Sequence, residues 1–143
     1  GVPLNRYPIT AEQVVAEEAI YLLSTTLQQV AREGTAKDLA RRLPDLNIAG
    51  KTGTTDDLKD SWFAGFSANY NAVVWLGTDD NRPTKLTGAS GAMQVWADII
   101  GQIEYQPLRL IEPGGVVWAK DGWFASCVPF FEDHIPESYS ECD

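Results

Sequence analysis

The sequence predicts an α+β fold, a sandwich in which helices pack on one face of an antiparallel sheet. Three patterns predict it: an apolar helical period over residues 15–30, two aromatic and β-branched runs at 61–68 and 71–78, and a second helical period from residue 91. The chain has 143 residues, of which 44% are hydrophobic and 22% charged, a composition that supports one packed domain. The expected order is helix, strand, strand, strand, helix, with consecutive strands paired.

The first helix is expected to open at a capping box and to end at a glycine. Thr10 and Gln13 have the capping-box spacing, and Gly34 is the expected stop. The apolar stripe of this helix comprises Val15, Ala19, Leu22, Leu23, Leu27 and Val30. A second, short helix is expected from Thr35 to Pro44, because proline ends a helix.

Three strands and a further helix follow. The stretch "LNIAGKTGTT" (46–55) is rich in Gly and Thr and predicts the first strand, and the runs at 61–68 and 71–78 predict an antiparallel hairpin that turns near Asn69. A helix is expected from Gly91 to Gln106. Its apolar stripe comprises Met93, Trp96, Ile99, Ile100 and Ile103.

Each long helix has one apolar stripe, so both are expected to cover the same face of the sheet. The opposite sheet face is then left without cover, and the residues that would cover it are not in this chain. The sheet aromatics are expected mostly in the core, with one or two on the cleft side: Trp62, Phe63, Phe66 and Trp75. The chain starts at Gly1 and its one methionine is Met93, which indicates a piece of a longer protein.

The last 37 residues differ in character, so the chain is divided into a core at 1–106 and a C-terminal extension at 107–143. The extension holds seven acidic residues against Arg109 and Lys120. "GVVWA", "KDG" and "WFASC" predict a small hairpin with a turn at Lys-Asp-Gly, followed by an acidic tail. His134, the one histidine, is expected to be a surface residue of that tail.

The extension also contains both cysteines, Cys127 and Cys142. There is no CxxC motif and no histidine at ligand spacing, so a zinc site is not expected. The pair is a candidate disulfide, which would indicate an oxidising compartment. The alternative is an inert reduced pair.

The net charge of −9 argues against a nucleic-acid partner, which requires basic residues along one face. The basic residues that do cluster, between residues 32 and 42, are interrupted by Glu33 and Asp38 and predict a solvated helix face. No apolar run approaches the ~20 residues that span a bilayer.

The stretch "NIAGKTGTTDD" (47–57) carries the chemistry of the chain. A phosphate-binding loop requires a glycine five positions before Gly50, where Asp45 stands, and a helix directly after it. Both conditions fail. The second interpretation is a strand beside a cleft, where alternation puts Lys51 on one face and the hydroxyls of Thr52 and Thr54 on the other. An ammonium and hydroxyls at such a strand suit a substrate carboxylate.

The context of this stretch resembles a known family. "AGKTGTT", "SWFAGF" and "VVWLGTDDNRPTKLTGASGAMQVWADI", with "AIYLLSTTLQQVAREGTAKDL" upstream, resemble the C-terminal half of the transpeptidase domain of class A (bifunctional) penicillin-binding proteins. The hairpin and the two-cysteine tail look like the 1B type of that family. The likeness covers nearly the whole chain and rests on several separated motifs in the right order.

The resemblance implies a peptidoglycan D,D-transpeptidase that works through a serine acyl-enzyme. Lys51 and Thr54 would then be catalytic: Lys51 supplies positive charge and a proton-relay contact, and the Thr54 backbone amide forms one side of an oxyanion hole. Lys51, Thr52, Gly53 and Thr54 would bind the substrate, with the hydroxyls on its terminal carboxylate.

The implied ligands are stem peptides that end in D-Ala-D-Ala and the β-lactams that mimic them. The implied place is the periplasmic side of the bacterial inner membrane, with the anchor outside this chain. The N-terminal half of the same protein is an implied partner, and cell-envelope regulators and a second copy of the protein are further candidates. No cofactor and no metal are expected.

The chain departs from the family in one important respect. None of its serines is followed by lysine three residues on, so the family's Ser-x-x-Lys nucleophile is absent. Ser67-Ala68-Asn69 has the form of a second family motif but follows Lys51, whereas the family places it before. It is interpreted as a hairpin turn in which Asn69 tolerates a positive φ. The chain alone is therefore expected to be inactive, and the family's glycosyltransferase domain is also missing from it.

Two alternatives stay open. A serine β-lactamase shares the Lys-Thr-Gly strand, although the tail and aromatic hairpin fit it less well. A non-catalytic cell-envelope module would use the acidic tail and the stapled hairpin for binding. Of the other candidates, Asp56, Asp57 and Asp60 are assigned to a solvated turn rather than to metal or acid–base chemistry, and "GASGA" (88–92) to a closely packed helix entry.

Overall fold

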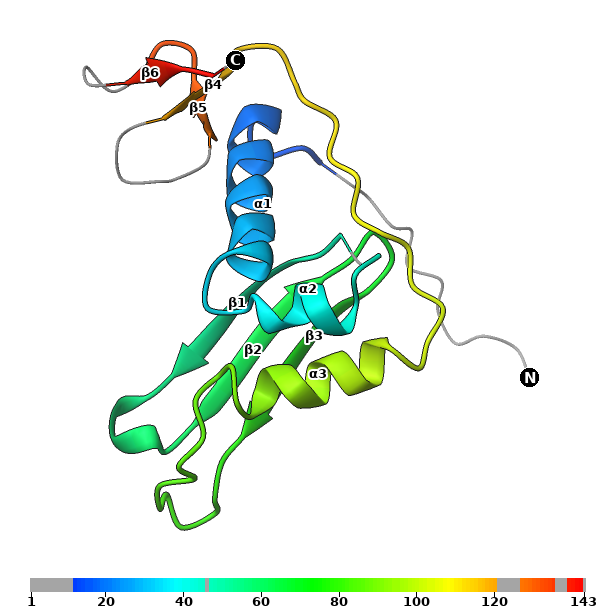
Figure 1. Ribbon diagram of the computed structural model, residues 1–143, viewed down its shortest axis with the longest axis vertical. Coiled ribbons are helices and arrows are strands. Elements are labelled where there is room, and N and C mark those ends of the chain that lie inside the picture. Colours follow the sequence, from blue (N-terminus) through cyan, green and yellow to red (C-terminus); the bar gives the residue numbers. More distant parts are fainter. Residues whose placement is uncertain (1–11, 46, 121–126, 136–138, 143) are drawn as a thin grey trace.

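The computed structural model describes residues 12–45, 47–120, 127–135 and 139–142, which form helices and two antiparallel sheets (Figure 1). The helices are α1 (Glu17–Arg32), α2 (Asp38–Arg42) and α3 (Ala92–Ile100). The strands are β1 (Ala49–Thr54), β2 (Ser61–Phe66), β3 (Asn71–Leu76), β4 (Val116–Lys120), β5 (Val128–Phe131) and β6 (Ser140–Glu141). A 3-10 turn spans Asp56–Leu58. The predicted α+β class and the strand order of the main sheet are confirmed.

The main sheet runs β1-β2-β3 with antiparallel neighbours, and α3 packs on one of its faces against β2 and β3. Figure 1 shows α2 and α3 across that face, while α1 runs from β1 toward the second sheet. Phe63 and Trp96 meet edge to face between sheet and α3, with ring centroids 5.2 Å apart. The core cluster comprises Ala31, Ala36, Leu39, Ile48, Phe63, Ala92, Met93, Trp96, Ala97 and Ile100.

Strand β2 shows why only one face is covered. Ser61, Phe63 and Gly65 are buried and alternate with exposed residues, as period 2 requires. Trp62 and its cross-strand partner Trp75 stay 42% and 50% exposed, on the face opposite the helices. The predicted uncovered face is confirmed. Of the four sheet aromatics, Phe63 is buried in the core, while these two tryptophans stay exposed because no described element packs on their face.

Helix α1 differs from its prediction at its start. It begins at Glu17 after Ala16, which makes no side-chain cap bond, and the side chain of Gln13 bonds the carbonyl of Val15 instead. Thr10 lies outside the described residues. The predicted capping box is therefore wrong for this helix.

The predicted apolar stripe of α1 holds only in part, since Val30 packs against the core while Leu23 is 57% exposed and Val15 is exposed as well. The buried face is largely polar: Tyr21, Ser24, Thr25, Gln28 and Ala31. Polar partners explain it, because the Gln28 amide donates to the carbonyl of Leu108 at 3.0 Å, 80 residues away. A non-local hydrogen bond outweighed the local apolar pattern.

The other helices are shorter than predicted. α2 covers five residues, and α3 stops at Ile100, where Gly101 caps it, rather than at Gln106. Ile99 is 48% exposed, so the predicted α3 stripe holds only in part.

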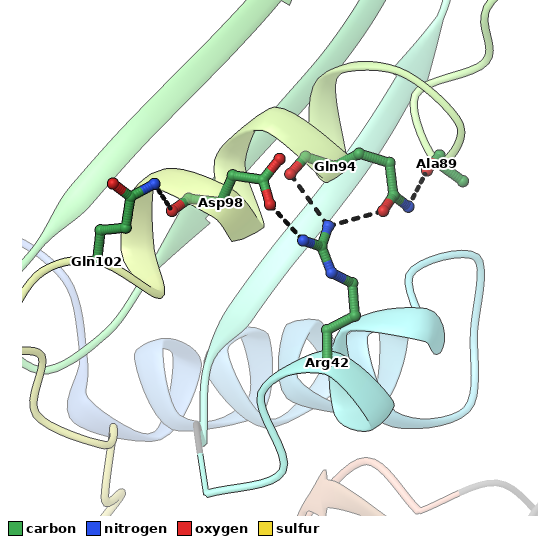
Figure 2. Close-up of polar contacts among 5 residues, drawn as sticks. All are labelled: Arg42, Ala89, Gln94, Asp98 and Gln102. Atoms are coloured by element: carbon green, nitrogen blue, oxygen red, sulfur yellow. Dashed lines mark hydrogen bonds and ion pairs between the residues drawn. The ribbon is translucent and has the colours of Figure 1, made fainter.

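The side chain of Arg42 joins α2 to α3 (Figure 2). Its guanidinium donates to the Gln94 side chain at 2.8 Å, to the Gln94 carbonyl at 3.2 Å, and to the Asp98 carboxylate. Gln94 in turn donates to the carbonyl of Ala89 at 2.9 Å. The basic residues of this cluster are exposed, as predicted, and the charge of Arg42 in addition links two helices.

The extension forms a second sheet in the order β5-β4-β6. The predicted turn and most of the predicted strand at 123–127 lie outside the described residues, and β5 starts only at Val128. Strand β6 was not predicted. Cys127 and Cys142 form a disulfide with their Cα atoms 6.2 Å apart.

Candidate functional site

Strand β1 lies at the edge of the main sheet, since in the described part of the chain it pairs only with β2. The Thr55 amide donates to the carbonyl of Asp60 at 3.2 Å, which makes 55 and 60 a hydrogen-bonded pair. Such pairs alternate with non-bonded ones along an antiparallel ladder. The N–H and C=O groups of Thr52 and Thr54 therefore point away from β2, toward the open edge.

The two threonine hydroxyls lie on the helix side of this edge. The Thr54 hydroxyl accepts a hydrogen bond from the Gly88 amide at 2.9 Å, and the Thr52 hydroxyl meets that of Thr35 at 2.8 Å. Because Gly88 uses an acceptor site of Thr54, the hydroxyl proton of Thr54 is available for an anion. The arrangement suits a ligand carboxylate at the edge of the strand.

Lys51 projects from the opposite face, where its cross-strand neighbour is Ala64. Its side chain is exposed, and its ammonium donates to the carbonyl of Thr52 at 2.8 Å. No carboxylate among the described residues forms an ion pair with it. The predicted alternation of Lys51 and the threonines is thus confirmed, and a positive charge lies next to the open edge.

Close backbone packing holds this strand in place. A Cβ on Gly88 would stand 2.7 Å from the Gly53 carbonyl oxygen and 2.6 Å from that of Trp62, so the loop before α3 rests directly on β1 and β2. Ser61 lies beneath the same loop, where its hydroxyl donates to the Thr87 carbonyl and accepts from the Ala92 amide, both at 2.8 Å. The predicted close packing of "GASGA" is confirmed.

Asp60 does not belong to a solvated turn, and that prediction is wrong. One of its carboxylate oxygens accepts from the Thr55 hydroxyl at 3.0 Å and the other from the indole N–H of Trp75 at 2.9 Å. The Asp60 amide donates back to the Thr55 hydroxyl at 2.8 Å. A Thr and an Asp that flank a short strand connection are the sequence signal that could have indicated this pair.

The Ser67–Asn69 motif forms the β2–β3 turn, as predicted, and plays no part at the edge of β1. The Tyr70 amide donates to the Ser67 hydroxyl at 3.1 Å. Asn69 does not have a positive φ, contrary to expectation. Its side-chain carbonyl accepts instead from the Gln106 amide at 2.8 Å, which ties the turn to the segment after α3.

The remaining candidates lie apart from the edge. His134 is exposed, as predicted, and its hydrogen bond with Asp133 lowers the pKa of that carboxyl. Across the described ranges, no three His, Cys, Asp or Glu side chains gather closely enough to hold a metal ion.

Comparison with known families finds a match over most of the chain. The model of the penicillin binding protein transpeptidase domain matches residues 6–101. The chain belongs to the penicillin-binding protein transpeptidase family. In this penicillin-binding protein sequence the match includes all of β1 and the loop that holds it.

The relatives confirm the predicted likeness to the 1B type. Penicillin-binding protein 1B of Haemophilus influenzae is 43% identical over 109 residues, which are 76% of this chain and 14% of that protein. Penicillin-binding protein 1B of Escherichia coli K12 is 44% identical over 103 residues, 72% of this chain and 12% of that protein. The chain thus spans only a small part of the curated relatives it matches.

A solved structure confirms the fold. The crystal structure of penicillin-binding protein 1A from Haemophilus influenzae matches with a TM-score of 0.70 and 25% sequence identity. The match covers 85% of this chain and 21% of that one. This penicillin-binding protein chain therefore has the architecture of one part of a larger transpeptidase structure.

Proposed function

We propose that this chain is the C-terminal part of a peptidoglycan D,D-transpeptidase and supplies one wall of its active site. The open edge of β1 carries the proposal, because Lys51, Thr52 and Thr54 present an ammonium, hydroxyls and backbone groups that no described strand pairs with there. Membership of the penicillin-binding protein transpeptidase family supports it. The nucleophile comes from a part of the protein upstream of Gly1.

The proposed reaction begins when the upstream serine attacks the penultimate D-Ala carbonyl of a stem peptide. The carbonyl oxygen becomes an oxyanion, and the outward-pointing Thr54 amide stabilises it; one such donor typically contributes ~3–4 kcal/mol. Terminal D-Ala leaves, and an amine of a neighbouring strand takes the acyl group. A cross-link between two stem peptides results.

The substrate is held by its terminal carboxylate in this proposal. The Thr52 and Thr54 hydroxyls donate to it, and the exposed Lys51 ammonium supplies positive charge and a proton-relay contact. Gly53 has no side chain to obstruct the approaching peptide. A β-lactam carries an equivalent carboxylate and a reactive carbonyl, so it enters the same place and leaves a stalled acyl-enzyme.

The rest of the protein completes the site and the fold. The upstream half covers the sheet face that exposes Trp62, Val73 and Trp75. The proposed place of action is the periplasmic side of the inner membrane, with an anchor outside this chain. Over the described residues, every helix is too short or too polar to cross a bilayer.

Acylation of the full-length protein by a fluorescent penicillin tests the proposal. Wild type should label, Lys51→Ala should lose most labelling, and Lys120→Ala, which removes an exposed lysine of β4, should label like wild type. Undiminished labelling of Lys51→Ala contradicts the role of Lys51. Full-length wild type that never labels contradicts the function, and rapid turnover of nitrocefin would indicate a β-lactamase instead.

A further inference from the structure

Three residues form a row across the end of the main sheet, next to the candidate oxyanion donor. Thr55 faces Asp60, and the β2–β3 register, continued by one residue, places Gly77 on the other side of Asp60. Asp60 therefore lies between β1 and β3. It binds both strands, through the Thr55 hydroxyl at 3.0 Å and the Trp75 indole N–H at 2.9 Å.

The indole of Trp75 reaches Asp60 only because Gly77 has no side chain. A Cβ on Gly77 would stand 2.2 Å from one carbon of the Trp75 ring and 3.0 Å from the Asp60 carboxylate. The ring thus lies over the backbone of its own strand. Its other neighbour is Trp62, with ring centroids 6.1 Å apart, so the indole is confined on two sides.

The turn between Thr55 and Asp60 needs such a restraint. Asp57 and Leu58 have φ values of 59° and 55°, in the left-handed region that side chains disfavour. The Leu58 carbonyl accepts from the amide and the hydroxyl of Thr84, at 2.8 and 2.9 Å. The tip of the turn is therefore fixed by Thr84, and its base is closed by the reciprocal bonds of Thr55 and Asp60.

We propose that Asp60 is a positioning residue for the Thr54 amide, acting through Thr55 and braced by Trp75. The proposal rests on the proposed transpeptidase function. Thr54 directly precedes Thr55. The hydrogen-bonded pair of Thr55 and Asp60 is the last pair of the β1–β2 ladder, and it holds the Thr54 N–H in its outward direction. Without the Asp60 carboxylate the Thr55–Asp60 pair becomes less ordered, and the Thr54 amide is no longer held in the direction of the developing oxyanion.

The effect should fall on the transition state rather than on binding. An oxyanion donor acts when charge develops, whereas the carboxylate contacts of Lys51 and the threonines act in the first complex as well. Misplacement of a catalytic group by about 1 Å costs ~100-fold in rate. Loss of Asp60 should therefore slow acylation by about 10- to 100-fold while the non-covalent affinity for a β-lactam changes by less than about 3-fold.

Stopped-flow acylation of the full-length protein by a fluorescent penicillin separates the two quantities. Asp60→Ala should show the slow acylation, Asp60→Asn should recover part of the rate because its amide oxygen still accepts from Trp75, and Asp56→Ala is the matched control. Asp56 belongs to the same turn and carries the same charge, but its side chain is exposed. The Asp56→Ala variant should acylate at the wild-type rate.

Trp75→Phe and Thr55→Val remove one partner each; valine keeps the branched shape of threonine, and phenylalanine keeps an aromatic ring without the N–H donor. Both should acylate more slowly than wild type, and they carry the test if Asp60→Ala does not fold. A purely structural role would lower the labelled fraction and the melting temperature but leave the rate constant of the labelled fraction unchanged. An unchanged rate constant of this kind overturns the positioning role. So does a wild-type rate constant in Asp60→Ala, Trp75→Phe and Thr55→Val alike. If wild type itself does not acylate, the proposed function fails instead.

Discussion

The backbone amide of Gly88 donates a 2.9 Å hydrogen bond to the hydroxyl of Thr54, across 34 residues of sequence. Gly88 is buried in the loop before α3, and Thr54 is exposed at the open edge of β1. A buried amide left without its acceptor costs ~1–3 kcal/mol. The bond therefore couples the order of a core loop to the position of the candidate oxyanion residue.

Thr54→Val should test this coupling, because valine keeps the branched shape and removes the acceptor. We expect a loss of about 1–3 kcal/mol in domain stability and weaker labelling by fluorescent penicillin. Thr54→Ser, which keeps the hydroxyl, should stay near wild type in stability. Thermal melting of the full-length proteins provides the comparison, and equal melting of the valine and serine variants would argue against the coupling.

Gly88→Ala should disturb the contact between the loop before α3 and strands β1 and β2. The added methyl group would meet backbone oxygens at 2.6 and 2.7 Å, and overpacking of this kind costs ~1–3 kcal/mol. Gly114→Ala is the control, since a Cβ there meets nothing within 4 Å. Thermal melting should show a lower midpoint for Gly88→Ala alone. A Gly88→Ala variant as stable as Gly114→Ala would mean that the loop yields without cost.

Arg42→Ala should loosen the packing of α2 on α3. The Arg42 and Asp98 side chains are 37% and 61% exposed, so solvent weakens their ion pair and we expect a loss of only about 0.5–1 kcal/mol. Arg41→Ala breaks an exposed ion pair within α2 and should change stability by less than about 0.5 kcal/mol. Urea unfolding checks both variants. A larger loss of unfolding free energy in Arg41→Ala than in Arg42→Ala would contradict the role of Arg42 in joining the helices.

Tyr21 should make the stability of the domain sensitive to alkaline pH. Burial raises the pKa of its phenol above 10.0, and the hydrogen bond to Glu112, at 3.1 Å, raises it further. The folded state then resists a deprotonation that the unfolded state undergoes near pH 10. The stabilisation from Tyr21 is complete below that pH and is lost as pH rises through the folded-state pKa.

Melting temperatures at about pH 8 and pH 10.5 should reveal this contribution. The melting temperature of wild type should fall more between these two pH values than that of Tyr21→Phe, because phenylalanine cannot ionise. An equal loss in both proteins would show that Tyr21 does not titrate as its surroundings indicate.

The Cys127–Cys142 disulfide should stabilise the extension. It closes a separation of 15 residues, for which the chain-entropy model gives ~3 kcal/mol. Cys127→Ser with Cys142→Ser should therefore make residues 107–143 more susceptible to limited proteolysis, while the core at 49–100 resists. A reactive free thiol at either position in the non-reduced protein would contradict the pairing.

Local patterns in the sequence were sufficient for much of the fold. Period-2 alternation in β2, the short turn at 67–70 and the helical period near Trp96 each depend on neighbours within a few residues, so they identified the strands, their antiparallel order and α3. The alternation of Lys51 with Thr52 and Thr54 follows from strand geometry alone. For the same reason, the covered and uncovered faces of the sheet could be predicted.

What the sequence determined by itself is thus the order of elements, the α+β class and the Lys-Thr-Gly-Thr strand. Only the tertiary structure decided which face of α1 is buried, because Gln28 bonds a carbonyl 80 residues away. It also decided that Asp60 binds two strands and that Trp75 lies over Gly77. Those outcomes depend on contacts between distant segments, and a local period contains no information about which distant group will meet it.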